Sequence, residues 1–192
     1  MNELIYKLDI PPLDQVLDNK FDLYTLVPEN FVGSKILYYH PREIFKNEWC
    51  NFLGYEWDYV SCFIRSGRKK SIIHRDNPHC PTQLHWGINW TLGARSLMEY
   101  WPLEDIEQES IIKDNGNKET VLLKTTKQPF KTYTLEPGAY LVNASIPHRA
   151  TNLENNLRFA VSLRSKKIRN TEEFKTWNNV VDRFSFLFQQ NQ

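Results

Sequence analysis

The sequence has no excess of charge of one sign, no long apolar run and no pair of closely spaced cysteines. Its 24 Lys and Arg residues balance 23 Asp and Glu residues, which leaves a net charge of +1. This balance argues against general affinity for nucleic acids. No stretch approaches the roughly 20 apolar residues that a membrane span needs, and residues 1–4 lack the pattern of a secretory signal. We expect neither a membrane nor a nucleic acid as partner.

Cysteine is scarce, and its spacing carries no metal or disulfide signature. Cys50, Cys62 and Cys80 are separated by 12 and 18 residues and form no C-x-x-C pair. An odd number of cysteines in this pattern favours reduced thiols, and a cytoplasmic location is expected. Aromatic residues make up 14% of the 192 residues, which excludes a disordered, collagen-like or coiled-coil chain.

Extended segments dominate the middle of the chain and predict a mainly β protein with flanking helices. Eight short strands with turn signals between them are expected between about residues 58 and 164, a rhythm typical of a jelly roll or barrel. The expected strands are 59–64, 71–74, 84–92, 96–101, 120–126, 130–135, 139–143 and 157–163. We expect one domain over residues 1–192, with an N-terminal flank at 1–57, the core at 58–164 and a C-terminal helix within 165–192.

Helices are predicted on both sides of this core. One covers residues 13–20, and a second follows Pro41 over residues 42–53 and stops at Gly54. In the predicted C-terminal helix, Asn170 is the expected N-cap, and apolar residues recur at helical spacing. This helix either packs on a sheet face or mediates a homodimer.

Three charged segments are predicted to be exposed. The acidic residues 104–119 form either a solvated excursion or a loop that covers substrate. The basic runs at residues 65–70 and 164–169 are interpreted as solvated turns.

Two histidines and one carboxylate form the first chemical pattern. His74 and Asp76 make an H-x-D at the end of an expected strand, where residues i and i+2 project to the same side. His148 follows the expected strand 139–143 closely and supplies a third ligand from across the barrel. Two histidines and a carboxylate on one face, with open coordination positions, are the ligands of non-haem Fe(II) oxygenases.

Arg158 adds a fourth element, ten residues after His148 and inside the apolar strand 157–163. A buried guanidinium needs an anionic partner, and its planar fork suits a carboxylate. That partner is either an internal Asp or Glu or a small dicarboxylic cosubstrate.

Taken together, His74-x-Asp76, His148 and Arg158 make the chain resemble the Fe(II)/2-oxoglutarate-dependent oxygenases over residues 58–164, especially small prolyl-hydroxylase-like members of phage and bacterial type. The resemblance implies a double-stranded β-helix, a jelly-roll or cupin-like barrel. It also implies that iron(II) is bound by His74, Asp76 and His148, and the distal carboxylate of 2-oxoglutarate by Arg158. Such enzymes use O2 to hydroxylate a C–H bond, here of a small-molecule or peptidyl substrate, forming succinate and CO2. Related halogenases lack the carboxylate, so Asp76 favours hydroxylation.

The chain departs from this family at one point. Many members place a serine two residues after the arginine, where this chain has Ala160. The second anchor of the distal carboxylate is therefore open, and the candidates are Ser162, Ser71, Asn89 and Tyr100.

Three interpretations other than the oxygenase can be considered for these residues. Residues 147–152 resemble the second motif of metal-binding cupins, but the H-x-H and glutamate of the first motif are missing, and Arg158 has no role there. A jelly-roll binding module without catalysis is another. A kinase catalytic loop, suggested by residues 73–76, is excluded because Pro81 stands where that loop needs an asparagine.

Overall fold

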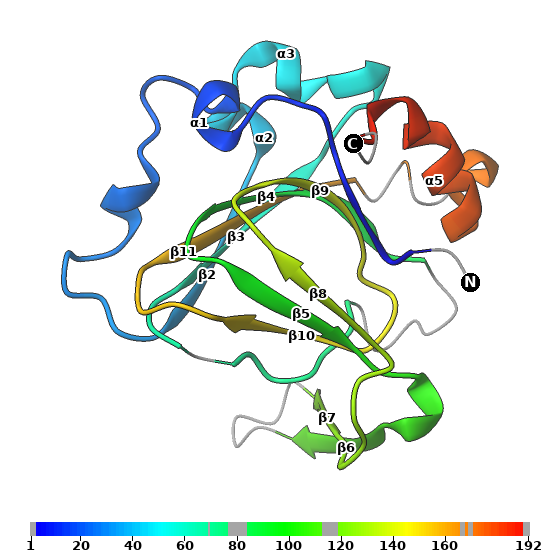
Figure 1. Ribbon diagram of the computed structural model, residues 1–192. Coiled ribbons are helices and arrows are strands. Elements are labelled where there is room, and N and C mark those ends of the chain that lie inside the picture. Colours follow the sequence, from blue (N-terminus) through cyan, green and yellow to red (C-terminus); the bar gives the residue numbers. More distant parts are fainter. Residues whose placement is uncertain are drawn as a thin grey trace.

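Two antiparallel sheets face each other in the computed structural model, which describes residues 3–68, 70–76, 84–112, 119–165, 168 and 171–189 (Figure 1). The six-stranded main sheet has the order β1-β9-β4-β11-β3-β2, and the three-stranded minor sheet has the order β10-β5-β8. The strands of the two sheets are β1 (Ile5–Lys7), β2 (Ser34–Tyr39), β3 (Tyr59–Arg65), β4 (Trp86–Gly93), β5 (Ser96–Tyr100), β8 (Lys131–Leu135), β9 (Gly138–Asn143), β10 (His148–Asn152) and β11 (Arg158–Arg164). The predicted fold class, a mainly β jelly roll with flanking helices, is confirmed.

Helices cover the outer face of the main sheet, on the side away from the minor sheet (Figure 1). They are α1 (Leu13–Val16), α2 (Pro41–Ile44), α3 (Asn47–Cys50) and α5 (Trp177–Phe184). The chain also has 3-10 turns at Leu23–Leu26, Phe52–Gly54, Glu172–Phe174 and Ser185–Leu187, and one at Leu103–Asp105 beside the β6–β7 hairpin (Figure 1). Within the described ranges, no helix is both long and apolar enough to cross a membrane.

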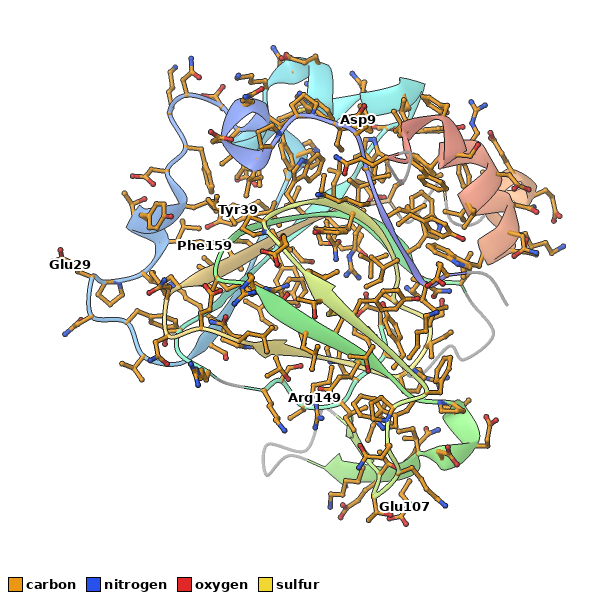
Figure 2. All side chains as sticks on the ribbon, viewed as in Figure 1. Asp9, Glu29, Tyr39, Glu107, Arg149 and Phe159 are labelled. Atoms are coloured by element: carbon orange, nitrogen blue, oxygen red, sulfur yellow. The ribbon has the colours of Figure 1, made fainter. Side chains whose placement is uncertain are left out.

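The side chains of β11 point alternately into an apolar core and into a more polar interior. Phe159, Val161 and Leu163 point outward into the large core between the main sheet and the helices, and Figure 2 labels Phe159 there, beside the N-terminal segment. Successive side chains of a strand alternate in direction. The other side chains of β11 therefore point between the two sheets: Arg158, Ala160, Ser162 and Arg164. A smaller apolar cluster, including Met98, Tyr100 and Tyr140, fills one part of that interior.

The predicted second helix is broken because its backbone pairs with another segment. Phe45 is 1% exposed and forms a bridge with Leu17. The N–H of Lys46 donates to the carbonyl of Val16 at 3.0 Å. Burying Phe45 in this way draws residues 45 and 46 out of the helical conformation, so α2 and α3 replace one continuous helix.

The C-terminal helix begins later than predicted. The Thr176 hydroxyl caps α5 by accepting the N–H of Asn179 at 3.2 Å. The expected cap Asn170 lies outside the described residues, as does Cys80. α5 buries Val180 and Phe184 in the large core, which matches packing on a sheet face. A homodimer stays a prediction.

Four further expectations differ from the structure. Residues 71–74 form only isolated bridges instead of a strand, whereas β10 was not predicted because its sequence is polar. The acidic segment contains the strand β6 (Glu107–Ile112), which pairs with β7 (Glu119–Lys124), the strand expected at 120–126, as a hairpin beyond the minor sheet (Figure 1). Two strands of the N-terminal flank, β1 and β2, form the edges of the main sheet.

The two basic runs begin inside the barrel and are not wholly solvated turns. Arg65 and Arg164 are the last residues of β3 and β11. Arg164 is 8% exposed. The register of β3 and β11 turns both side chains toward the interior. The basic composition of the two runs does not reveal this register.

Candidate metal centre

His74, Asp76 and His148 converge at one end of the barrel. His74 and His148 exchange two backbone hydrogen bonds, of 2.9 and 2.7 Å, as an antiparallel bridge, and their ring centroids are 4.4 Å apart. The N–H of Asp76 donates to the carbonyl of Ala144 at 3.0 Å. One ligand atom from each residue lies within 4.8 Å of the others, so the three can hold a metal ion.

Both imidazoles are oriented in the same way. The Nδ1 atom of His74 lies 3.1 Å from the carbonyl of Ile72, and that of His148 lies 2.8 Å from the carbonyl of Ile146. A carbonyl oxygen only accepts, so each Nδ1 carries the proton and each Nε2 presents its lone pair.

Burial keeps these rings in the form that binds metals. It lowers the pKa of His74 to about 3, with a further contribution from the neighbouring His148. Burial also lowers the pKa of His148. Both imidazoles are therefore neutral at neutral pH, as a metal ligand must be.

Asp76 is held by a chain of polar side chains that runs across the main sheet. Arg164 donates from Nη1 to Asp76 Oδ2, and from Nε to the hydroxyl of Ser162 at 2.7 Å. That hydroxyl donates to Asn89 Oδ1 at 2.5 Å. A Cβ on Gly87 would lie 2.9 Å from Ser162 Oγ and 3.2 Å from Arg164 Cγ, so the absence of a side chain there makes room for the chain of contacts.

This donor set fits iron(II). Two neutral nitrogen ligands and one carboxylate on a single face form the arrangement of non-haem Fe(II) sites. Ligand atoms about 2.0–2.2 Å from one ion lie at most roughly 4.4 Å apart, close to the separation found here. Arg164 donates to Oδ2 of Asp76, and a carboxylate has a second oxygen that can bind a metal.

Arg158 lies on the interior face of β11 and is 5% exposed. Its Nε has no hydrogen-bond partner in the described part of the chain, and no described Asp or Glu forms an ion pair with it. Burial, followed by the positive charge of Arg65, lowers its pKa to about 10. Among the described residues, the internal ion pair considered from the sequence therefore has no acidic partner.

The four candidates for a second carboxylate anchor each have a protein partner. Ser162 and Asn89 belong to the polar chain that holds Asp76. The Tyr100 hydroxyl donates to the carbonyl of Asn143 at 3.2 Å, and Ser71 Oγ accepts the N–H of Ala150 at 2.9 Å.

Sequence reasoning missed Arg65 and Arg164. The available signal was period-2 spacing, because Arg158, Ser162 and Arg164 share one face of a strand.

A cavity of about 550 Å³ lies between the segments at residues 102–104, 130 and 145–147. Most of its lining is apolar, with one cationic and one acidic residue: Arg75, Pro102, Leu103, Glu104, Phe130, Ser145, Ile146 and Pro147. Arg75 and Pro147 are sequence neighbours of the candidate ligands, but none of the ligands themselves lines this cavity.

The outer face of the minor sheet carries a separate ion pair. Arg149 donates from Nε and Nη2 to Glu99 at 2.8 and 2.9 Å and stacks on Trp101, 5.0 Å from its ring centroid. Figure 2 labels Arg149 on the side of the minor sheet that faces the β6–β7 hairpin.

Comparisons with known proteins give no family for the chain. No family model matches, and no curated protein matches significantly. Among solved structures, Peruvianin-I, a cysteine peptidase from Thevetia peruviana latex, matches with a TM-score of 0.39 and 14% identity over 76% of this chain and 71% of that one.

Two further solved structures cover more of the chain. Escherichia coli ycfD has a TM-score of 0.39 and 16% identity, covering 88% of this chain and 40% of its own. A cupin superfamily protein from Desulfitobacterium hafniense has a TM-score of 0.34 and 9% identity, covering 83% and 98%. At these identities and scores the matches assign no activity to this chain.

Proposed function

We propose that the chain is an Fe(II)- and 2-oxoglutarate-dependent dioxygenase that hydroxylates a C–H bond of an amino acid or peptidyl residue. The observation that carries the proposal is Arg158, a buried guanidinium without an anionic partner among the described residues. It shares the interior face of β11 with Arg164, which holds Asp76. A dicarboxylic cosubstrate with one end at the metal and the other at Arg158 supplies the missing anion.

Arg158 is connected to the strand of His148 through Arg65. Arg158 is the register partner of Arg65 on β3. Arg65 Nη1 donates to the carbonyl of Ala150 at 2.7 Å. Ala150 lies two residues after His148 on β10, roughly 7 Å along a strand. A five-carbon dicarboxylate such as 2-oxoglutarate is the proposed bridge between Arg158 and the metal.

Each residue has a defined part in this proposal. His74, Asp76 and His148 would hold the iron through two Nε2 atoms and one carboxylate oxygen. When bound, iron with 2-oxoglutarate and O2 supplies the oxidising chemistry by which R–H becomes R–OH, while 2-oxoglutarate becomes succinate and CO2. Arg164 fixes the carboxylate of Asp76, and Arg158 positions the cosubstrate.

The cavity of about 550 Å³ is the proposed place for the primary substrate. Its lining of Pro102, Phe130 and Ile146 excludes water from an apolar group, and Arg75 and Glu104 offer charges of opposite sign at its walls. An amino acid or peptide segment combines an apolar side chain with polar ends.

A metal-dependent cupin enzyme that does not use 2-oxoglutarate is the second candidate. The same His/Asp/His cluster supports it. It gives no role to Arg158, and this difference makes the two candidates separable by experiment.

Calorimetric titration tests the proposal. 2-Oxoglutarate is titrated into the protein with and without Mn(II), a redox-inert substitute for iron(II). We expect binding only in the presence of metal, loss of metal binding in His74→Ala, and no change in the outer-face control Arg149→Gln. A protein that binds Mn(II) but not 2-oxoglutarate contradicts the oxygenase and supports the cupin-type enzyme.

A further inference from the structure

Two arginines lie side by side in the interior with no acidic partner between them. Arg65 on β3 and Arg158 on β11 are register partners on neighbouring strands. Like charges directly opposite each other destabilise a sheet, and here each is partly or fully removed from water. In the part of the chain that the structure describes, no carboxylate pairs with either guanidinium.

The hydrogen bonds of Arg65 do not neutralise its charge. Its Nε donates to the hydroxyl of Ser34 at 3.2 Å, and its Nη1 donates to the carbonyl of Ala150 at 2.7 Å. Both acceptors are neutral. These contacts tie the guanidinium to β2 on one side and to the middle of β10 in the facing sheet. An anion is still required to balance the pair.

We propose that Arg65 is the second anchor of the distal carboxylate that Arg158 binds. The inference rests on the proposed function and deepens it. The candidates with hydroxyl and amide groups already have protein partners, whereas Arg65 lies beside Arg158 with a fixed orientation and an uncompensated charge. Two guanidiniums, one from each neighbouring strand, then hold one carboxylate.

With two arginines at this position, the negative charge of the distal carboxylate decides which 2-oxo acid binds. A 2-oxo acid of the same chain length that ends in a methyl group, 2-oxopentanoate, would leave both arginines without an anion. Hydrogen bonds to charged groups are strong enough that losing one such contact weakens binding by about ten- to hundredfold. Arg65 should therefore contribute to the preference for 2-oxoglutarate and hardly at all to the binding of 2-oxopentanoate.

The test compares the two ligands in wild-type and variant protein loaded with Mn(II). The variants are Arg65→Gln, which removes the charge, and Arg65→Lys, which keeps the charge but not the fork. Arg68→Gln removes an exposed arginine three residues away as a matched charge control. Calorimetry gives both affinities for each protein.

The expected result is a fall in the preference for 2-oxoglutarate over 2-oxopentanoate of about ten- to hundredfold in Arg65→Gln. A smaller fall is expected in Arg65→Lys, and none in Arg68→Gln. Arg65→Lys keeps a donor for Ala150, and it decides the matter if Arg65→Gln does not fold, because an unchanged preference in Arg65→Lys contradicts an anchoring fork.

The outcomes separate this inference from the function on which it rests. If wild-type protein binds 2-oxoglutarate and Arg65→Gln weakens both ligands equally, Arg65 only ties β3 to β10, and the inference is wrong while the oxygenase stands. If metal-loaded wild-type protein does not bind 2-oxoglutarate, the proposed function fails, and the assignment of Arg65 fails with it.

Discussion

Replacing Arg158 with methionine separates a cosubstrate anchor from an internal ion pair, because the two roles predict opposite effects on stability. Burial lowers the pKa of Arg158 from its ordinary value to about 10, which corresponds to a cost of about 3 kcal/mol for the charged form. For a cation with a lowered pKa, this cost is present in full below that pKa, and therefore at pH 7. Methionine keeps an apolar stem and removes the charge. The free energy of unfolding without ligand should stay the same or rise by up to about 3 kcal/mol.

An ion pair predicts the reverse. Removing one partner of a buried pair leaves the other charge stranded and typically costs about 3–5 kcal/mol. Urea unfolding of metal-free wild-type and Arg158→Met protein at pH 7 measures the difference, and 2-oxoglutarate titration of the folded, metal-loaded variant should show affinity weakened by roughly a few hundredfold. Destabilisation by about 3 kcal/mol or more, or unchanged affinity in a stable variant, would refute the assignment.

Three other predictions follow from the metal centre. Burial lowers the pKa of His74 to about 3, so below about pH 6.5 the unfolded chain binds a proton that the folded chain does not. The contribution of His74 to the free energy of unfolding of the metal-free protein should therefore fall by about 1.4 kcal/mol per pH unit as the pH drops toward 5. Urea melts of His74→Gln should show a shallower dependence, and an equally steep one contradicts the reasoning. Arg164→Met should weaken Mn(II) binding by about 10–100-fold in calorimetry, whereas Arg149→Met, on the outer face, should not. Gly87→Ala should cost about 1–3 kcal/mol in urea unfolding, since its Cβ would press on the side chains that hold Asp76; an unchanged midpoint would show that this contact relaxes freely.

The shared direction of His74 and Asp76 follows from local pattern and strand periodicity, whereas His148 joins them through a long-range bridge with His74. An H-x-D in extended chain sends both side chains one way, and this needs no knowledge of distant contacts. The β strands were predictable for a similar reason, since Val, Ile and aromatic residues alternate along them. β10 was missed because its sequence is mostly polar and does not alternate between apolar and polar residues.

The residues around the ligands were not predictable in the same way. Arg65 and Arg164 each begin a run of basic residues in the sequence, and composition alone indicates solvated turns. Their burial depends on where β3 and β11 end relative to the minor sheet, which is a matter of tertiary register. The broken second helix has the same origin, because the pairing of Phe45 with Leu17 outweighs local helix propensity.

Formation of succinate tests the central claim most directly. Purified protein is supplied with Fe(II), 2-oxoglutarate, O2 and ascorbate, without any primary substrate, and succinate is measured by mass spectrometry. The account predicts slow, iron-dependent succinate formation that is abolished in His74→Ala and unaffected in Arg149→Gln. A folded, iron-loaded wild-type protein that forms no succinate would contradict it.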